Sequence, residues 1–387
     1  MPAQILTLHG FIKDVTYQAH LTNRLEEYDF AHFDINAAST SGVILHEQQQ
    51  LAFSKWVSPK RTRSYPFERI YNTLNAQKIV TIIPIIKDEG KDGDLDKIQY
   101  STFSWMNLLN VYVVLAFYDS AEKNLAPQQA HRHKITSQRF NAAFVNEQLQ
   151  EIMHYRQSAL HWNRTLLENR FITTFERALA SYQQISEATG VSMNPRKSLK
   201  SYLASIQADF EQFKKQSLKA SESASKREIQ TTHKHEFLET ATKAKLVIKN
   251  YLGGEYFLTA DEILLEWHKG QKRLIIQESK NTGQSLLPSV SDIKDGLFKL
   301  VLYSNLDSIS LAEEKISFAT RLYLSGKCNG RITLHTASGQ DFTAFFSKNP
   351  SLTTAQKELL LTLQKEAQAN NLEIVVSSHL GGANGAA

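Results

Sequence analysis

The spacing of hydrophobic residues changes twice along the chain and predicts three regions. In residues 1–135, apolar runs at 78–87 and 111–118 predict two buried strands, and residues 101–110 between them predict a short helix. Pro84 within the first run indicates a bulge or an edge strand. A strand, helix, strand order favours a parallel pair of strands, so this region is expected to be mixed α/β.

Residues 136–230 show the three-to-four-residue spacing of amphipathic helices. The apolar positions that carry this spacing are Phe140, Phe144, Leu149, Ile152, Tyr155, Phe171, Phe175, Leu179 and Tyr182. Thr189 and Gly190 predict the end of the second helix, because glycine readily adopts the left-handed conformation found at helix ends. The region is therefore expected to be helical.

Residues 231–387 return to an α/β pattern. A helix is predicted over 231–251, ending at Gly253 and Gly254. Strands are predicted at 262–267 and 273–279, joined by a glycine-containing hairpin loop at 268–272. The remaining predicted elements are helices at 292–303 and 353–369, and strands at 319–324, 330–336, 342–346 and 372–377.

Composition narrows the class of protein. Hydrophobic residues make up 42% of the 387 residues, which excludes a wholly disordered chain. The single cysteine, Cys328, excludes an internal disulfide framework and a cysteine-based zinc site, and it favours the reducing cytoplasm. The first residues lack the pattern of a secretory signal, and no apolar run is long enough to span a bilayer, so no membrane partner is expected.

The formal net charge of +5 is concentrated in two stretches. Residues 53–79 hold six basic residues and one acidic residue, and residues 195–250 hold twelve basic and six acidic residues. Localised positive charge suits phosphate binding, which makes a nucleic acid a candidate partner. For the second stretch, a solvated helix face explains the charge equally well.

The predicted hairpin in the third region carries two acids and a lysine. Asp261 lies at the start of the first strand, and Glu278 and Lys280 lie two positions apart on the second. Side chains alternate across a strand, so Glu278 and Lys280 point to one face, and the hairpin returns that face beside Asp261. Two carboxylates bind Mg²⁺ well, and the lysine can orient or deprotonate a water and offset phosphate charge.

These residues resemble the PD-(D/E)xK nuclease superfamily. In this resemblance Asp261 corresponds to the first acid of the motif, Glu278 to the second acid and Lys280 to the lysine. The two acids are 17 positions apart, which suits the hairpin of that family. The resemblance covers residues 231–350 at most. It implies a core ordered helix, strand, strand, strand, helix, strand, in which the helix predicted over 231–251 comes first.

The same resemblance implies a metal site and leaves one assignment open. Asp261, Glu278 and Ser279 would be the Mg²⁺ ligands, and either Glu236 or Glu239 could add an outer carboxylate. No proline precedes Asp261, and Glu262 lies beside it, so either acid could be the first of the motif.

The layout of the chain resembles a bacterial type II restriction endonuclease. This implies Mg²⁺-dependent hydrolysis of double-stranded DNA at a specific site, and a homodimer, because one active site per chain must cut two antiparallel strands. Two other functions stay open: a non-catalytic DNA-binding or regulatory protein that keeps the nuclease fold, and a nuclease of this fold in repair or phage defence. The structural alternative is a surface hairpin with a cross-strand ion pair.

Two further segments carry candidate chemistry. Residues 58–66 are extended by prolines and carry Lys60, Arg61, Arg63 and Tyr65, which suit contacts to DNA phosphates or to a guanine edge. A basic surface loop is the alternative. Residues 88–96 are acidic and follow a buried strand, where open sheets place sites, and a solvated loop is again the alternative.

Overall fold

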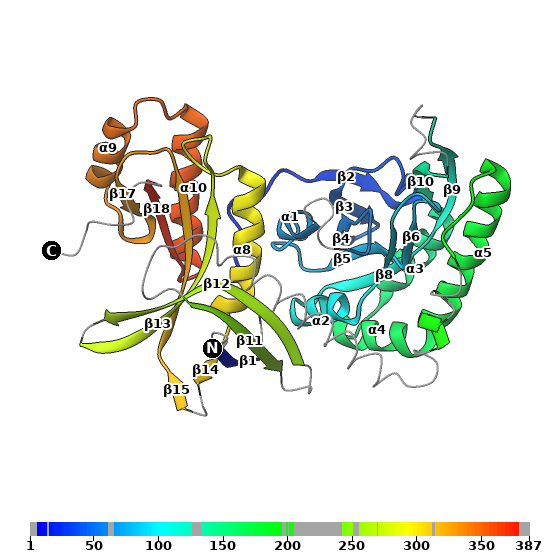
Figure 1. Cartoon of the computed structure of the whole chain (residues 1–387), viewed down its shortest axis with the longest axis horizontal. Helices are drawn as coiled ribbons and strands as arrows, with labels where there is room; N and C mark the ends of the chain where they lie inside the picture. Colours follow the sequence, from blue (N-terminus) through cyan, green and yellow to red (C-terminus); the bar gives the residue numbers. More distant parts are fainter. Residues whose placement is uncertain are drawn as a thin grey trace. The chain divides into compact units, whose positions relative to one another are not determined.

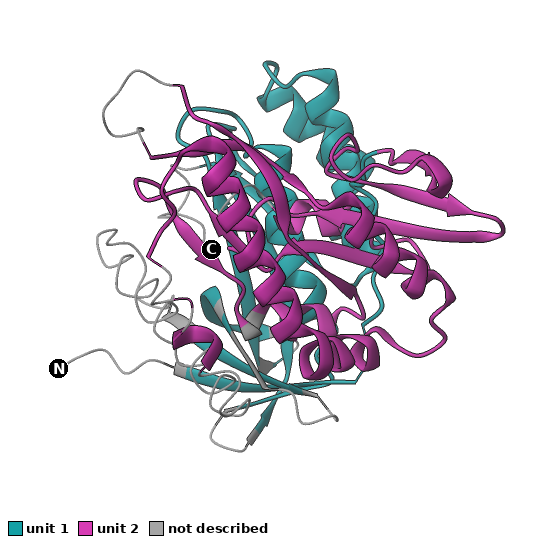
Figure 2. Cartoon of the chain, turned by 90° about the vertical axis from the view of Figure 1, so that its right-hand side faces the viewer, with its two compact units in different colours: residues 1–23, 220–387 teal, residues 24–219 magenta. Residues whose placement is uncertain are grey.

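The computed structural model describes residues 6–13, 15–60, 66–125, 133–195, 199, 201–204, 242–250, 255–268, 270–311 and 314–378. The chain is mixed α/β and divides into two compact units (Figure 2). Unit 1 contains residues 1–23 and 220–387, and unit 2 contains residues 24–219. The three predicted regions differ from these units: the N-terminal strand joins the third region, and the helical middle shares one unit with the rest of the first region.

Unit 2 is built on a five-stranded sheet with the order β2-β3-β4-β5-β8. Its strands are β2 (Glu26–Asp29), β3 (Ser41–His46), β4 (Gln49–Lys55), β5 (Ile79–Pro84) and β8 (Tyr112–Ala116). β5 runs parallel to β8, as predicted, and also parallel to β4. Every residue of β5 and β8 is buried, which explains why both read as continuous apolar runs. β5 lies inside the sheet, and Pro84 is its last residue, so the predicted edge position is wrong.

Helices and two short hairpins complete unit 2 (Figure 1). The helices are α1 (Pro66–Tyr71), α2 (Tyr100–Leu108), α3 (Ala142–His154), α4 (Ala159–Thr165) and α5 (Phe171–Thr189), with a 3₁₀ turn at Phe30–His32 and a π-helical turn at Leu166–Arg170. The hairpins pair β6 (Ile86–Asp88) with β7 (Leu95–Lys97) and β9 (Tyr118–Lys123) with β10 (Ile135–Phe140). The predicted helical middle region is confirmed over 142–189, whereas Phe140 ends β10, and residues 205–230 lie outside the described residues. The helix α5 is followed by Gly190 in the left-handed conformation, at φ 66°.

Unit 1 is built on a nine-stranded mixed sheet with the order β15-β14-β1-β11-β12-β13-β16-β18-β17. These strands are β1 (Leu6–Ile12), β11 (Thr242–Asn250), β12 (Glu255–His268), β13 (Gln271–Asn281), β14 (Ser308–Leu311), β15 (Glu314–Ile316), β16 (Phe318–Gly326), β17 (Arg331–Thr333) and β18 (Glu373–Ser378). Its helices are α8 (Val290–Ser304), α9 (Gly339–Lys348) and α10 (Thr354–Ala369), with a 3₁₀ turn at Leu334–Thr336. The predictions of α8, α10, β16 and β18 are confirmed.

The helix predicted over 231–251 is wrong where the structure describes it. Residues 242–250 form β11, which pairs in parallel with β1 and antiparallel with β12. Leu246, Val247 and Ile248 are consecutive and buried, as in a strand covered on both faces. Pairing on both sides overrides the local helical signal. Residues 231–241, with Glu236 and Glu239, lie outside the described residues.

The strand predicted at 342–346 is also wrong, because these residues belong to α9. Phe342 and Phe345 are the buried positions, and their three-residue spacing is helical rather than alternating. Ser338 and Asp341 form a capping box at the start of this helix. The capping residues were therefore a stronger signal than the aromatic run.

No helix within the described ranges has the length and apolarity that crossing a membrane requires.

Candidate active site on the β12–β13 hairpin

The predicted hairpin is present, and both of its strands are longer than expected. β12 and β13 are antiparallel, with Glu262 opposite Gln277 and His268 opposite Gln271. Gly270 in the connection has φ 78°, a conformation that glycine adopts easily. The register brings the end of β13 that carries Glu278 alongside the middle of β12.

Asp261 and Glu278 meet on one face of this hairpin. The carboxylate of Asp261 accepts a hydrogen bond from the backbone N–H of Ser279, at 3.1 Å. Glu278 is fully buried. The side chain of Glu262 instead accepts a hydrogen bond from Gln277. Gln277 and Glu278 are adjacent in a strand and point to opposite faces, so Asp261 is the acid that shares a face with Glu278.

A lysine from α8 lies between the two acids. Lys299 Nζ is 2.8 Å from Glu278 Oε2 and 3.9 Å from Asp261 Oδ1. Lys299 was not among the residues predicted from the sequence. Lys299 lies four residues after Asp295, so the two charged side chains lie on one face of α8. This spacing points to the site only when it is known that the same face of α8 packs on the sheet.

Lys280, the lysine of the predicted motif, has a different partner. Its Nζ is 2.5 Å from Asp295 Oδ2. Gly296 lets α8 approach the sheet closely here, since a Cβ at this position would lie 2.8 Å from Leu322 Cδ1 and 3.2 Å from Lys280 Cε. Lys280 still contributes positive charge that lowers the pKa of Asp261. The site therefore contains three acids and two lysines on adjoining elements.

The two central acids have pKa values shifted in opposite directions. Burial raises the pKa of Glu278 to about 8, because Lys299 offsets only part of the penalty and the charge of Asp261 adds to it. Burial also works to raise the pKa of Asp261, but Lys299, the Ser279 N–H and Glu278 together hold it below its ordinary value. The pair is therefore expected to retain one proton at neutral pH without a bound cation.

The two carboxylates fit a hard divalent cation. Glu278 Oε1 is buried and has no hydrogen-bond partner among the described residues, so an oxygen ligand is available beside Asp261. No cluster of three or more histidine, cysteine or acidic side chains with metal-site geometry is found in the described ranges. Two carboxylates completed by water are typical of Mg²⁺ sites.

Ser279 contacts this site through its backbone only. Its N–H donates to Asp261, whereas its hydroxyl accepts a hydrogen bond from Gln277, at 3.3 Å, on the other face of β13. Of the groups of Ser279, only the backbone carbonyl is therefore left as a candidate metal ligand.

The candidate DNA-contact segment and the acidic loop meet in unit 2. Lys60 Nζ lies 2.6 Å from Asp96 Oδ1, and Ser58 donates to the other oxygen of Asp96 at 2.8 Å. Asp96 is almost fully buried, so Lys60 neutralises a buried carboxylate. Arg61, Arg63 and Tyr65 lie outside the described residues.

The acidic loop is less solvated than its charge suggests. Asp88 is buried and accepts hydrogen bonds from the backbone N–H of Gly90 and from the side-chain amide of Asn194. Burial raises the pKa of Asp88, and these hydrogen bonds offset part of that effect. The solvated-loop alternative is therefore wrong for Asp88 and Asp96, which anchor the segment on which they lie.

Comparison of the chain with protein-family models, with curated proteins and with solved structures gives no match.

Proposed function

We propose that this chain is a Mg²⁺-dependent endonuclease of the PD-(D/E)xK kind that hydrolyses double-stranded DNA, most similar in layout to a type II restriction enzyme. One observation carries the proposal. Asp261 and the buried Glu278 lie side by side on a hairpin, with Lys280 on the same face two residues beyond Glu278. That arrangement combines a cation site with an ammonium group that can act on water or phosphate.

The order and pairing of the elements support the same assignment. β11, β12 and β13 form an antiparallel meander, and α8 follows; after the short strands β14 and β15, β16 pairs in parallel with β13. This matches the strand, strand, strand, helix, strand part of the core that the resemblance implies. The leading helix of that core, predicted over 231–251, is not found over 242–250, which form β11, and residues 231–241 lie outside the described residues.

The residues of the site can be given separate roles. Asp261 and Glu278 would hold Mg²⁺, and the Ser279 N–H fixes the orientation of the Asp261 carboxylate. When bound there, the cation would acidify a water and stabilise negative charge on the phosphate. Lys280 would position the attacking water and offset developing charge. Asp295 holds the Lys280 ammonium in place, and Lys299 contacts Glu278 at 2.8 Å and favours its charged form.

A second candidate function is a DNA-binding or regulatory protein that keeps this fold without cleaving. Two observations favour it: both lysines are already paired with carboxylates, and the raised pKa of Glu278 leaves it protonated at neutral pH. A protonated carboxyl is a poor ligand for Mg²⁺. Cation binding would have to displace that proton before the site becomes competent.

A plasmid assay separates these candidates. The full chain is incubated with supercoiled plasmid and Mg²⁺ at pH 7 and pH 9, beside Glu278→Gln and a matched control, Glu262→Gln, on the other face of the hairpin. Discrete bands made only with Mg²⁺, and lost in Glu278→Gln, support the restriction enzyme. A smear supports a nonspecific nuclease of the same fold. A gel shift with no cutting at either pH supports the binding protein and contradicts the nuclease.

The expected assembly is a homodimer, because two strands of opposite polarity must be cut by identical sites. Sedimentation of the chain on its cognate DNA in Ca²⁺ measures this, since Ca²⁺ should allow binding with little cleavage. A bound monomer that cuts both strands in one encounter would contradict the dimer.

A further inference from the structure

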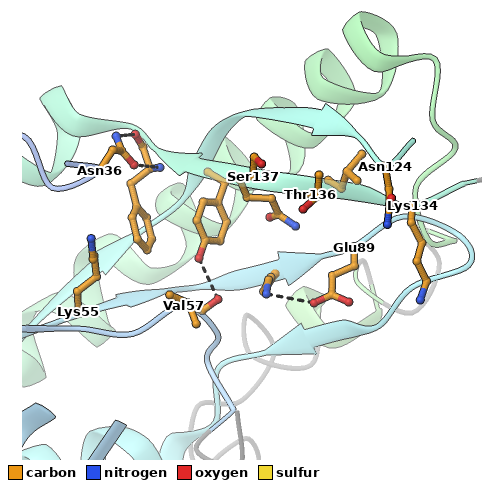
Figure 3. Close-up of a pocket in the computed structure, with 13 residues that line it drawn as sticks. Asn36, Lys55, Val57, Glu89, Asn124, Lys134, Thr136 and Ser137 are labelled. Carbon is orange, nitrogen blue, oxygen red and sulfur yellow. Dashed lines mark hydrogen bonds and ion pairs between the residues drawn. The ribbon is translucent and has the colours of Figure 1, made fainter. Parts of the chain in front are cut away.

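Unit 2 contains a cavity of about 460 Å³, and none of its lining residues belongs to the β12–β13 hairpin (Figure 3). Its lining comes from the segments that follow β4, β5 and β8, and from the β9–β10 hairpin. Figure 3 shows Lys55 near one end of the cavity, Lys134 and Asn124 near the other, and Glu89 between them. The volume lies within the range of small-molecule sites.

The topology of the sheet explains why a site forms here. β4, β5 and β8 are parallel, so their carboxyl ends reach the same edge of the sheet. Lys55 ends β4, Lys87 lies three residues beyond the end of β5, and Tyr118 lies two residues beyond the end of β8. Open α/β sheets bind ligands at this edge.

The cavity carries an excess of positive charge. Lys55, Lys87 and Lys134 line it with one acid, Glu89, which lies 3.1 Å from Lys87 Nζ. Three ammonium groups and one carboxylate leave a net charge of about +2 at neutral pH. Thr136, Ser137 and Asn124 add hydroxyl and amide groups to the lining.

Lys55 is held in place by neutral groups rather than by an acid. Its Nζ donates to the carbonyls of Ile35 and Ala38, at 2.8 and 2.6 Å, and Arg69 donates to the carbonyl of Lys55. Neither cation lies within ion-pair distance of a carboxylate in the described part of the chain. Burial lowers the pKa of both groups, and the charge of Arg69 lowers the pKa of Lys55 further. Among the residues that the structure describes, the fold thus positions two half-buried positive charges with no carboxylate at ion-pair distance.

We propose that this cavity binds a small phosphomonoester, with its phosphate neutralising the lysines at the carboxyl edge of the sheet. A phosphomonoester carries −1.5 to −2 charges at neutral pH, which matches the excess in the cavity. Its three terminal oxygens accept several hydrogen bonds at once, as the ammonium and hydroxyl groups of the lining require. The proposal is independent of the proposed nuclease activity.

The test is calorimetric titration of the full chain in EDTA, which keeps divalent cations from the β12–β13 site. The probes are inorganic phosphate, AMP, adenosine as the phosphate-free control, and a short DNA duplex. AMP and phosphate should bind with a dissociation constant of about 1 mM or tighter, and adenosine should not. The duplex should not compete with AMP.

Variants of the lining locate the binding. Lys134→Gln should weaken AMP binding about tenfold, a loss of about 1.4 kcal/mol. Glu89→Gln should strengthen it, because the repelling charge is lost. Lys91→Gln, an exposed position of unit 2 outside the cavity, is the matched control and should bind as the wild type does. Circular dichroism confirms that each variant is folded.

Three results would overturn the proposal. The first is no saturable binding of phosphate or AMP. The second is adenosine binding as tight as that of AMP, which would mean recognition of the base. The third is that AMP does not bind, whereas the duplex binds and Lys134→Gln weakens that binding. This result would mean that the cavity contacts phosphodiesters of DNA.

Discussion

Lys299 Nζ lies 2.8 Å from Glu278 Oε2 and 3.9 Å from Asp261 Oδ1, so one ammonium group serves both acids of the candidate active site. Glu278 is fully buried, and a buried carboxylate is strongly disfavoured unless a cation or a proton neutralises it. In this structure the positive charge next to Glu278 is the ammonium group of Lys299, on the neighbouring helix α8. A divalent cation bound by Glu278 and Asp261 would lie close to that ammonium group.

The first prediction concerns stability and metal. At pH 9, where Glu278 is ionised, Lys299→Met should destabilise unit 1 by about 3 kcal/mol in EDTA, because it leaves Glu278 buried beside Asp261 without its cation. Saturating Ca²⁺ should recover most of that loss, since the cation replaces the missing charge. Urea unfolding with EDTA and with Ca²⁺ measures both effects. Lys315→Met, on an exposed residue of the same unit, is the control. If Ca²⁺ stabilises neither the variant nor the wild type, the two acids are not a cation site.

The second prediction concerns pH. The pKa of Glu278 is raised from its ordinary value of 4.5 to about 8 in the folded state, so between these values the folded state holds a proton that the unfolded state has lost. Stability without metal should therefore fall as pH rises from about 5 to about 8, by on the order of 1 kcal/mol or more. Urea unfolding in EDTA across this range measures the slope.

Glu278→Gln provides the control for the pH dependence, because an amide does not titrate. The variant should lose the decline in stability over this range. A wild-type slope in Glu278→Gln would show that other groups cause it. By the same reasoning, metal affinity and any metal-dependent cleavage should increase as pH rises through 8, because the cation no longer competes with the proton of Glu278.

The third prediction separates the two lysines. Lys280→Ala should reduce cleavage at least 100-fold, because the water and the developing phosphate charge lose their ammonium group, while DNA binding in Ca²⁺ persists. Lys327→Ala, on an exposed residue after β16, is the control. Quench-flow cleavage and gel-shift titration give the two readouts. Should Lys280→Ala cleave as fast as the wild type, Lys299 would be the lysine that acts.

The fourth prediction concerns an ion-pair network on unit 1. Arg321 is nearly buried on β16 and donates two hydrogen bonds to Glu266, at 2.6 and 2.9 Å, and two to Glu373, at 3.0 and 2.7 Å. Arg321→Met should destabilise the unit by about 2 kcal/mol, less than the full cost of an unpaired buried charge, because Arg273 still lies 2.6 Å from Glu373 and 4.0 Å from Glu266. Urea unfolding measures this beside Arg331→Met, an exposed position on β17. Equal losses in the two variants would contradict a special role of Arg321.

The sequence predicted local features of this protein well. Periodicity and end signals within short windows predicted the β12–β13 hairpin, the buried strands β5 and β8, and the helices α5, α8 and α10. Asp261, Glu278 and Lys280 were identifiable for the same reason, since their relation depends on a hairpin and on strand alternation.

What the sequence did not predict depends on contacts between distant segments. Residues 242–250 are a strand because β1 and β12 pair with them, and nothing local to the segment reveals those partners. Lys299 reaches the acids only because α8 packs on the face of the hairpin that carries them. The pairing of Lys60 with Asp96 likewise joins two loops that the sequence treats as separate. Side-chain pairs of this kind depend on how helices, strands and loops pack against one another. The sequence of a single segment does not specify that packing.

The parallel pairing of β1 with β11 also has a consequence for how the chain folds during synthesis. Leu6 pairs with Ala244, so β1 leaves the ribosome before its partner and must wait for it until all of unit 2 has been made. The strands of unit 2 come from one continuous stretch and can assemble earlier. β1 is an internal strand of its sheet, between β14 and β11. Deleting the first dozen residues would therefore remove a central strand and expose two edges, which is a route to aggregation.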